Sequence, residues 1–541
     1  MYIDVVPNRN SPPAVLLRES FREGKKIRKR TLANLSHLDP VRVEALRRAL
    51  RGDFDHLRDT QAVSGAYFGL LYTLHQLAQQ LGLVRSLGNS RSGKLQLFLV
   101  LARLAHGGSR LSAVRWAQQQ AVEEVLGLGA FDEDDLYAAL DQLAARQEEI
   151  EQRLYGDYVA RRGQAPLLFL YDVTSSYLEG QHNELAAYGY NRDGKRGKLQ
   201  IVVGLLTDPQ GEPLAVRVFS GNSQDVTTVG EQVEILKECF GVQQVVLVGD
   251  RGMLKAHGKQ ALGEVGLRYI TALTDPQIRK LLKEGTLQMG LFEEQICEVE
   301  AEGHRYILRK NEAEARRLIH RLEDKLAQLQ AGVQARNEKV RESRRCQPQA
   351  GLRKAQEWID RYRLSSFVTV RLEGRFLQLE VDDEGCQQAL LLAGCYVIET
   401  DVPASWLQAQ QVHDSYRNLA EVERDFRALK SHLLELRPIF VRKQSRTRGH
   451  VFSCMLALKI SREMRNRLVA HFGTTDDDPH GVTLEDAFEA LNRLTLDLYP
   501  VENDILIPRL PRPDPHQTRI LEALQVYLPG KFRQKPCVAR R

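Results

Sequence analysis

The chain has 541 residues, of which 43% are hydrophobic, and its formal net charge at pH 7 is +6. This hydrophobic fraction is enough for packed cores and excludes a chain that is disordered throughout. The length predicts about three or four domains. Because the net charge is small, only the distribution of charge along the chain can indicate what kind of partner the protein binds.

Apolar runs in this sequence are too short for a membrane protein. None approaches the roughly 20 residues that cross a bilayer, and the N-terminus has no apolar signal-peptide segment. The seven cysteines are scattered without a CxxC pair, which argues against a zinc ribbon and a disulfide framework. We therefore expect a cytoplasmic protein with reduced thiols and no membrane partner.

Residues 1–58 are expected to form a small module built on a β-hairpin. Two alternating runs meet at Glu23–Gly24, a pair that favours a tight turn. The basic cluster around the turn comprises Arg22, Lys25, Lys26, Arg28, Lys29 and Arg30. Contact with phosphate groups and protection of a solvated strand edge explain this cluster equally well.

Residues 59–160 are expected to form a helical, DNA-binding domain. Apolar residues recur at three-to-four spacing between Tyr67 and Tyr158, and glycines separate the runs. Short helices of this kind fit a helix-turn-helix reader of DNA. They fit a scaffold equally well, and no side-chain pattern separates the two.

Residues 161–274 have the pattern of an α/β domain. The expected elements are a strand at Ala165–Tyr171, a hairpin of Lys198–Asp208 and Glu212–Ser220, a helix at Thr227–Phe240, a strand at Gln244–Val248 and a strand at Leu267–Leu273. This order predicts a mixed sheet with helical crossovers. Asp172 directly follows the first strand, and Asp250 comes just after the fourth.

Residues 275–393 are expected to be an insertion into this domain. Strand-like pieces at His304–Arg309 and Phe367–Val381 surround a helical arm at Asn311–Ser343. The core is expected to resume over residues 394–470, with a strand at Gly394–Thr400 and a helix within His450–Leu468. Residues 471–541 form a C-terminal region whose basic tail contains Lys531, Arg533, Lys535, Arg540 and Arg541.

A helix is predicted from Tyr416 to Lys430. Its apolar stripe comprises Leu419, Val422, Phe426, Leu429 and, beyond it, Leu433. Tyr416, Glu423, Arg427 and Lys430 fall on an adjacent strip. Glu421 is a rival to Glu423, but it lies about 200° away around the helix, so we favour Glu423.

Asp172, Asp250 and Glu423 together suggest a cluster of three carboxylates. An acid after a strand is often only a turn residue, but the carboxyl ends of strands in an open sheet are also where sites form. Like charges this close need a cation, and carboxylate oxygens select Mg²⁺ or Mn²⁺. Two such ions can activate a water and stabilise the leaving oxygen of a phosphodiester.

Two further basic segments suit a polyanion such as double-stranded DNA. One lies within Asn191–Lys198 and the other within Arg437–Arg448. Their side chains are Arg192, Lys195, Arg196 and Lys198 in the first, and Arg437, Arg442, Lys443, Arg446 and Arg448 in the second. Contacts from these side chains to a DNA backbone would make binding salt-dependent.

Three spaced motifs, YDVTSS, VGDRGM and Y-x6-E-x6-K, resemble those of the DDE transposases of bacterial insertion sequences. The closest likeness is to the group with a Tyr/Arg/Glu/Lys signature, and it spans Leu167–Leu458. The resemblance implies a ribonuclease H-like core, with a helical domain before it and the insertion before the last acid. It places Asp172, Asp250 and Glu423 as catalytic ligands of two Mg²⁺ ions, or of Mn²⁺. The implied contacts to DNA phosphates are Tyr416 and Lys430, with Arg251, Arg424 and Arg427 as further candidates.

One position departs from this signature. Its arginine, three residues after the tyrosine, is replaced by Leu419, so Arg417, Arg424 or Arg427 would have to supply the cation. Trp358 and Trp406 are weak candidates for stacking on a flipped base, and core packing explains both more simply.

The resemblance implies a transposase that binds the terminal inverted repeats of an insertion sequence. Metal-bound water is expected to cleave the element end, and the exposed 3′-hydroxyl then attacks target DNA. A homodimer is expected because two ends must be brought together. The alternatives are a metal-dependent nuclease that does not join strands and a relic transposase that only binds DNA.

Overall fold

The computed structural model describes residues 1–541 apart from 9–11, 53–62, 191–193, 196, 224–234, 243–244, 252–258, 261, 264–265, 294–295, 344, 432–433, 438–439, 475–480, 502–504, 531–534 and 537–541. The chain divides into two compact units. The first comprises Met1–Leu77, Val114–Ala130 and Met464–Arg541, and the second comprises Ala78–Ala113 and Phe131–Glu463. No helix among the described residues is long and apolar enough to cross a membrane.

The first unit begins with a three-stranded antiparallel sheet of β1 (Tyr2–Val6), β2 (Ala14–Glu23) and β3 (Lys26–Asn34). The hairpin expected at Glu23–Gly24 is present as β2–β3, and Gly24 takes the left-handed backbone (φ +62°) that this tight turn needs. Helix α1 (Pro40–Arg51) follows, with the Asp39 side chain accepting a hydrogen bond from the Arg42 amide at its start.

The same unit contains a second, four-stranded sheet that the sequence patterns did not indicate. Its order is β17 (Lys535–Pro536), β16 (Ile505–Arg509), β15 (Thr495–Val501) and β4 (Val63–Tyr67). The pairing of β4 with β15 joins segments more than 400 positions apart, so neither segment alone could reveal it. Besides α1, the described helices that lie wholly within this unit are α6 (Val122–Leu126), α18 (Leu484–Asn492) and α19 (Pro515–Ala523). Of the basic tail, Lys535 lies in β17, while Lys531, Arg533, Arg540 and Arg541 lie outside the described residues.

Helices precede the main sheet, as the periodicity predicts. They are α2 (Gly69–Gln80), α3 (Leu83–Leu87), α4 (Arg91–Ala105), α5 (Arg110–Ala117), α7 (Glu133–Ala145) and α8 (Gln147–Arg162). In the second unit, α4 packs on α7 and α3 packs on α8. Helix α7 begins with a capping box between Asp132 and Asp135, which satisfies amides at its first turn.

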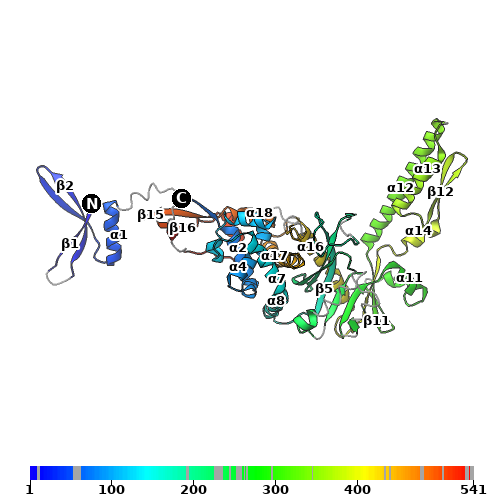
Figure 1. Ribbon diagram of the computed structural model, residues 1–541, viewed down its shortest axis with the longest axis horizontal. Coiled ribbons are helices and arrows are strands. Elements are labelled where there is room, and N and C mark those ends of the chain that lie inside the picture. The colour runs from blue at the N-terminus through cyan, green and yellow to red at the C-terminus, as the bar shows by residue number, and fades with distance from the viewer. Residues whose placement is uncertain are drawn as a thin grey trace. The chain divides into compact units, whose positions relative to one another are not determined.

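The second unit is organised around a mixed eight-stranded sheet, which confirms the predicted α/β class (Figure 1). Its order is β10 (Cys297–Ala301), β11 (His304–Lys310), β14 (Cys395–Thr400), β9 (Arg268–Ala272), β8 (Val246–Gly249), β5 (Leu168–Tyr177), β6 (Gln200–Thr207) and β7 (Pro213–Ser220). Strands β5, β8 and β9 are parallel, and the other neighbouring pairs are antiparallel.

The two faces of this sheet are covered by different helices. On one face, Phe169, Tyr171 and Val173 of β5 pack in a core with Tyr155 and Tyr158 of α8. The π-helix η2 (Ile235–Cys239) joins the same core; residues 227–234 of the helix expected there lie outside the described residues. Helices α15 (Ala409–Arg417) and α16 (Leu419–Lys430) contact strands of the sheet, α15 on β8, β9, β11 and β14 and α16 on β5.

The helical arm is built around its own core. Helices α12 (Glu312–Glu342) and α13 (Pro348–Tyr362) pack together with β12 (Val368–Glu373) and β13 (Phe376–Val381), as Figure 1 shows. Leu329, Val333 and Ile359 are buried there, and Trp358 packs against them. The remaining elements of this region are α11 (Asp275–Lys283), η3 (Met289–Glu293) and α14 (Asp383–Leu390).

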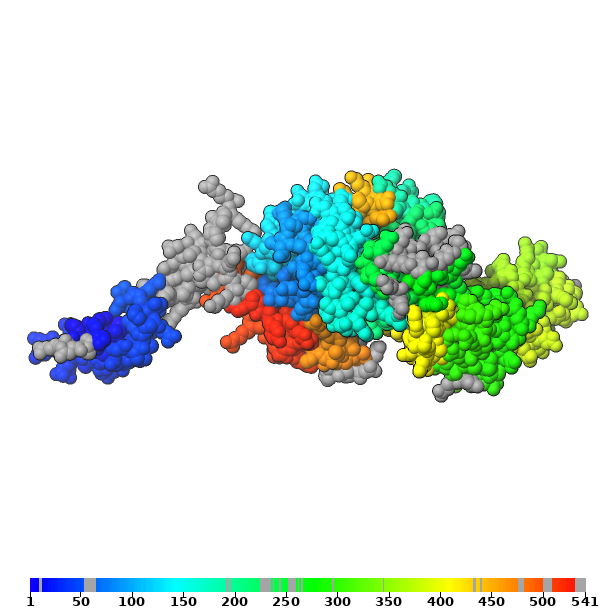
Figure 2. Space-filling view, turned by 90° about the horizontal axis from the view of Figure 1, so that it is seen from below, coloured from blue at the N-terminus to red at the C-terminus, as the bar shows by residue number. Residues whose placement is uncertain are grey.

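Strands β10 and β11 belong to the main sheet, although the sequence pattern predicts that residues 275–393 form an insertion. Backbone pairing of β11 with β14, from Arg305↔Thr400 to Lys310↔Cys395, extends the sheet at this edge. Figure 2 shows the yellow residues near 400 lying against the green residues near 300 on the surface of this unit.

The prediction of one helix from Tyr416 to Lys430 was wrong at its start. Tyr416 lies in the last turn of α15, and α16 begins at Leu419. Asn418 separates the two helices while keeping a nearly helical backbone (φ −66°, ψ −11°), so no helix-breaking residue marks the boundary. Helix α17 (Gln444–Phe472) follows and is longer than the run that the sequence predicted.

Candidate active site

The three predicted acids line one pocket of about 290 Å³ in the second unit. Asp172, Asp250 and Glu423 come from β5, from the residue after β8 and from α16. The other residues that line this pocket are Arg251, Tyr396, Tyr416, Arg417, Leu419 and Ala420. The acids are half-buried (Asp172) or exposed (Asp250 and Glu423).

The register of two parallel strands brings the two aspartates together. The last residues that β5 and β8 pair with each other are Tyr171 and Gly249, and each acid is the next residue along the chain. The Asp172 carboxylate accepts a hydrogen bond from the Val173 amide at 2.8 Å. The sequence predicted that this strand ends before Asp172. It continues instead, because residues 172–177 still pair with β6.

Helix α16 carries Glu423 on the side that faces the pocket. Leu419, Val422, Phe426 and Leu429 are buried on its apolar stripe, as predicted, whereas Leu433 lies outside the described residues. Burial of this stripe against the sheet leaves Glu423 at the exposed edge of the contact, where it can reach the pocket.

Arg462 of α17 fixes the opposite side of α16. Its guanidinium donates to Oδ1 of the buried Asp425 at 2.5 Å and to the Gln210 carbonyl at 2.7 Å. Glu421 lies 3.4 Å from the same guanidinium and also accepts two hydrogen bonds from Arg424, at 2.7 and 2.9 Å. Glu421 is therefore occupied by two arginines and does not line the pocket.

Close packing beside Arg462 requires a glycine. Gly211, in the turn between β6 and β7, has a left-handed backbone (φ +83°). A Cβ atom there would lie 2.8 Å from both the Arg462 guanidinium and the Glu421 Cβ. The turn thus adds to the support that holds α16, and with it Glu423, in place.

Tyr416 contacts one of the acids directly. Its phenol donates a hydrogen bond to Oδ1 of Asp250 at 3.3 Å. Burial, followed by the negative charge of Asp250, raises the pKa of Tyr416 well above its ordinary value, although Arg251 acts in the opposite direction. The phenol therefore keeps its proton at neutral pH and remains a donor.

Arg417 is the one of the three candidate replacements for the signature arginine that lines the pocket. Arg424 is bound to Glu421, and Arg427 is exposed on α16 without lining the pocket. The break at Asn418 explains the difference, because it ends α15 with Arg417 at the pocket while Leu419 enters the apolar stripe.

Of the other two predicted phosphate contacts, one lines the pocket and one does not. Arg251 lines the pocket, where its guanidinium lies 3.9 Å from Asp275. Lys430 is the last residue of α16 and does not line the pocket.

Several of the predicted DNA-binding side chains are held in ion pairs. Arg446 pairs with Asp141 at 3.2 Å and lies over the Tyr137 ring, and Arg437 pairs with Glu179 at 3.3 Å. Lys198 also approaches Glu179, at 3.6 Å, and Arg28 pairs with Glu23. Arg28 and Lys198 remain exposed despite these pairs, and so are Lys25, Lys26, Lys195, Arg442, Lys443 and Arg448; Arg192 and Arg196 lie outside the described residues.

Sequence reasoning missed Tyr396, which lies on β14 and lines the pocket. Its run, GCYVIET, indicates only a buried strand, and its place beside the acids depends on β14 pairing with β9. Neither tryptophan candidate lines the pocket: Trp358 packs in the arm, and Trp406 is half-buried in a turn closed by its amide on the Pro403 carbonyl.

The acids fit a divalent metal in chemical type. Three carboxylates supply the hard oxygen ligands that Mg²⁺ and Mn²⁺ prefer. As the side chains lie, however, the described residues contain no group of three His, Cys, Asp or Glu side chains that could hold an ion together. An ion held by all three acids at once would require them to lie closer together than they do here.

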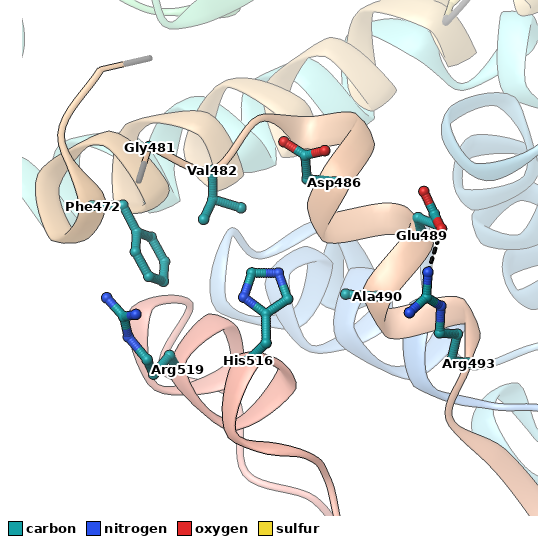
Figure 3. A pocket seen from close by; sticks show the side chains of 9 residues that line it. All are labelled: Phe472, Gly481, Val482, Asp486, Glu489, Ala490, Arg493, His516 and Arg519. Carbon is teal, nitrogen blue, oxygen red and sulfur yellow. Dashed lines mark hydrogen bonds and ion pairs between the residues drawn. The ribbon is translucent and has the colours of Figure 1, made fainter. Parts of the chain in front are cut away.

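A second pocket, of about 380 Å³, lies in the first unit (Figure 3). Its charged side chains are largely paired with neighbours: Glu489 with Arg493, and Asp486 with the amide and hydroxyl of Thr483. Arg519 lies over the Phe472 ring, 4.9 Å from its centre. His516 is the remaining titratable side chain of the lining, and we assign this pocket no chemistry.

Comparisons with known proteins show the family to which this chain belongs. The family model "Transposase DDE domain" matches residues 163–460, which is more than half of the chain, and "IS1634 family transposase, N-terminal domain" matches residues 3–63. A search of curated proteins finds no match. A solved structure titled "Cryo-EM structure of piggyBac transposase synaptic complex with hairpin DNA (SNHP)" is 9% identical over 74% of this chain and 69% of that one, with a TM-score of 0.34. That similarity is too low to support any inference. On the strength of the family models, the chain belongs to the DDE transposases of bacterial insertion sequences, enzymes that cleave and transpose DNA.

Proposed function

We propose that the pocket of Asp172, Asp250 and Glu423 is where this transposase cuts the terminal inverted repeats of its element and joins the exposed 3′-hydroxyls to target DNA. The observation that carries this proposal is that three acids, spread over more than 250 positions of sequence, line a single pocket. Reactions of this kind rely on positioning and on stabilising charge at the phosphorus, and clustered acids and arginines suit both.

The topology supports a ribonuclease H-like core. The run β7-β6-β5-β8-β9 joins a three-stranded antiparallel meander to parallel strands, and β14, β11 and β10 extend it with antiparallel strands. Within this proposal, residues 161–274 and 394–470 supply the core together with β10 and β11, and the rest of 275–393 is the insertion. Residues 1–58 and 59–160 are proposed to bind DNA, and 471–541 form the C-terminal region.

Asp172, Asp250 and Glu423 are the residues that would hold two Mg²⁺ ions, with Mn²⁺ as a substitute. When bound, such ions supply Lewis-acid activation of a nucleophile and stabilisation of the leaving oxygen. Metal dependence is general in this family. The protein's own part is to keep the acids oriented and close to the scissile phosphate.

Tyr416 and the arginines would orient the substrate around these acids. The phenol of Tyr416 holds the Asp250 carboxylate in one orientation at 3.3 Å. Arg251 and Arg417 would donate hydrogen bonds to non-bridging phosphate oxygens, with Arg417 supplying the cation that Leu419 does not. Arg427 and Lys430 lie about one and two turns after Glu423 on α16, and they would contact neighbouring phosphates.

The exposed basic side chains would contact duplex DNA outside the pocket. Lys443 and Arg448 lie on α17 or just before it, and Lys25 and Lys26 lie at the β2–β3 turn. A homodimer is proposed because joining both ends of an element requires two such pockets. We expect the protein to act on the bacterial chromosome, in the cytoplasm.

The proposal is tested with a labelled duplex that carries the element's own terminal inverted repeat, incubated with the protein, target plasmid and Mg²⁺. We expect cleavage at the repeat and covalent joining to the plasmid, both abolished by EDTA. A pre-cleaved end with a 3′-dideoxy nucleotide should bind but not join, because it lacks the nucleophile. Cleavage without any joined product would contradict transposition by this pocket and favour a simple nuclease.

A further inference from the structure

The pocket has two tyrosines, and their hydroxyls have different partners. Tyr416 donates to Asp250. Tyr396 instead bonds to His413, at 2.5 Å between the phenol oxygen and Nε2. His413 lies in α15 and has no exposed surface, so it cannot meet the substrate itself. Its contact with Tyr396 links a buried imidazole to the pocket wall.

The contacts of His413 fix which ring nitrogen carries the hydrogen. Nδ1 lies 3.0 Å from the Asp414 carboxylate, which can only accept when ionised. Nη1 of Arg309 lies 3.0 Å from Nε2 and 3.4 Å from Nδ1, so it does not distinguish the two nitrogens, and the Asp414 contact decides between them. The hydrogen therefore belongs on Nδ1 and the lone pair on Nε2. Burial, which lowers the pKa of His413, favours this neutral form.

The direction of the Tyr396 hydrogen bond follows from this. With Nε2 as an acceptor, Tyr396 must donate its only hydroxyl hydrogen to His413. Strands β11 and β14 place Arg309 and Tyr396 as a cross-strand pair on the same face, and both side chains contact the imidazole. The Tyr396 oxygen is thus left with lone pairs alone for any further contact.

An acceptor of this kind suits only part of a transposition substrate. Phosphate oxygens are themselves acceptors, so they cannot form a hydrogen bond with a lone pair of Tyr396. Water and the 3′-hydroxyl of a DNA end each have a hydrogen to donate. The three acids of the pocket would be committed to metal ions, and Arg251 and Arg417 supply donors, so Tyr396 adds a neutral acceptor that can orient a hydroxyl nucleophile.

We propose that Tyr396 accepts a hydrogen bond from the attacking hydroxyl, and that His413 is a positioning residue that holds Tyr396 in the acceptor role. The proposal rests on the function proposed above and adds a contact to the nucleophile. Tyr396 keeps its own proton throughout, because its hydrogen remains on the bond to Nε2. The effect is one of orientation, so it should act on the chemical step more than on DNA binding.

The test is single-turnover joining of a pre-cleaved end to target DNA by Tyr396→Phe, His413→Phe, the double variant and wild type. Each single variant should lower the joining rate about tenfold, as loss of one oriented hydrogen bond does, with the DNA concentration for half-maximal rate unchanged. The double variant should be no slower than either single variant, because the two side chains act through one bond. His413→Gln, whose amide oxygen can replace Nε2 as acceptor, should recover most of the rate.

Two outcomes would overturn the inference: a Tyr396→Phe rate equal to wild type, or single effects that multiply to about a hundredfold in the double variant. Should His413→Phe fail to fold, Tyr396→Phe and His413→Gln decide the matter alone. Tyr362→Phe is the matched control, since it removes a hydroxyl bonded to Gln328 in the arm and should leave the rate unchanged. Failure of wild type to cleave or join would contradict the proposed function instead.

Discussion

The phenol oxygen of Tyr416 lies 3.3 Å from Oδ1 of Asp250, across 166 positions of sequence. This contact ties the last turn of α15 to the carboxyl end of β8. The phenol therefore donates its hydrogen to an acid. The family signature had suggested instead that this tyrosine contacts a phosphate. One residue further along, Arg417 reaches the same pocket and is better suited to a phosphate.

Arg417→Ala should therefore slow cleavage of the element end by about 10- to 100-fold, because a charge-assisted hydrogen bond to the substrate contributes about 1.5–3 kcal/mol. Arg424→Ala is the matched variant on the next helix. Since Arg424 is bound to Glu421, outside the pocket, its loss should leave the rate within about twofold of wild type. Cleavage rates at saturating DNA check both, and a larger effect at Arg424 would place the missing signature cation there.

Much of the sheet could be predicted from sequence because its strands are buried. The runs around Phe169, Val203 and Val216 are apolar almost throughout, as strands covered on both faces must be. The acids could be predicted because each directly follows such a run or sits beside an apolar helical stripe. These patterns are local, so they can be recognised without knowledge of the fold.

What could not be predicted depends on distant pairing or on subtle backbone changes. Strands β10 and β11 join the main sheet only because β11 meets β14, about 90 positions later. Helix α15 ends at Asn418 although no residue there disfavours a helix, so the orientation of Arg417 could not be predicted from the sequence. Tyr396 and His413 carry no motif at all and become notable only through their hydrogen bond.

Two neighbouring basic residues should behave differently when DNA binding is measured against salt. Lys443→Ala removes an exposed charge and should reduce the slope of log K against log salt concentration by about 1. Arg446→Ala removes a side chain held by Asp141 and the Tyr137 ring, so it should leave that slope unchanged and destabilise the fold by about 1 kcal/mol. Fluorescence anisotropy from low to moderate salt, with thermal unfolding, checks the pair. Equal changes in slope would mean that Arg446 leaves Asp141 to bind DNA.

Glu212 should make stability depend on pH in the acid range. Burial acts against its charge, but Lys459 and Arg161 outweigh this and lower the pKa of Glu212 from 4.5 to about 2. A carboxyl group whose pKa is depressed in the folded state stabilises the protein above its unfolded pKa, and that contribution is lost as the pH falls through the folded value. The stabilisation should therefore be complete above about pH 5 and decline toward pH 2.

Glu212→Gln tests this, because it leaves the buried Lys459 without a charged partner. We expect the variant to be destabilised by about 3–5 kcal/mol at pH 7, and the gap to wild type to narrow below pH 4.5. Urea unfolding at several pH values measures the gap. Glu489→Gln, in an exposed pair with Arg493, is the control and should show little effect. A gap for Glu212→Gln that stays constant down to pH 2 would show that the carboxylate charge is not the cause.

The most direct test of the account is cleavage of a labelled element end with Mg²⁺ by wild type, Asp250→Ala, Glu423→Gln and Glu421→Gln. Glu421 lies on the same helix as Glu423 but is held by Arg424 and Arg462 away from the pocket. The account predicts that wild type and Glu421→Gln cut and join. Asp250→Ala and Glu423→Gln should bind the same DNA yet lose both activities by at least a thousandfold, as loss of a residue that holds an essential catalytic group does. If Asp250→Ala and Glu423→Gln cut as well as wild type, the three acids are structural and the chemistry lies elsewhere.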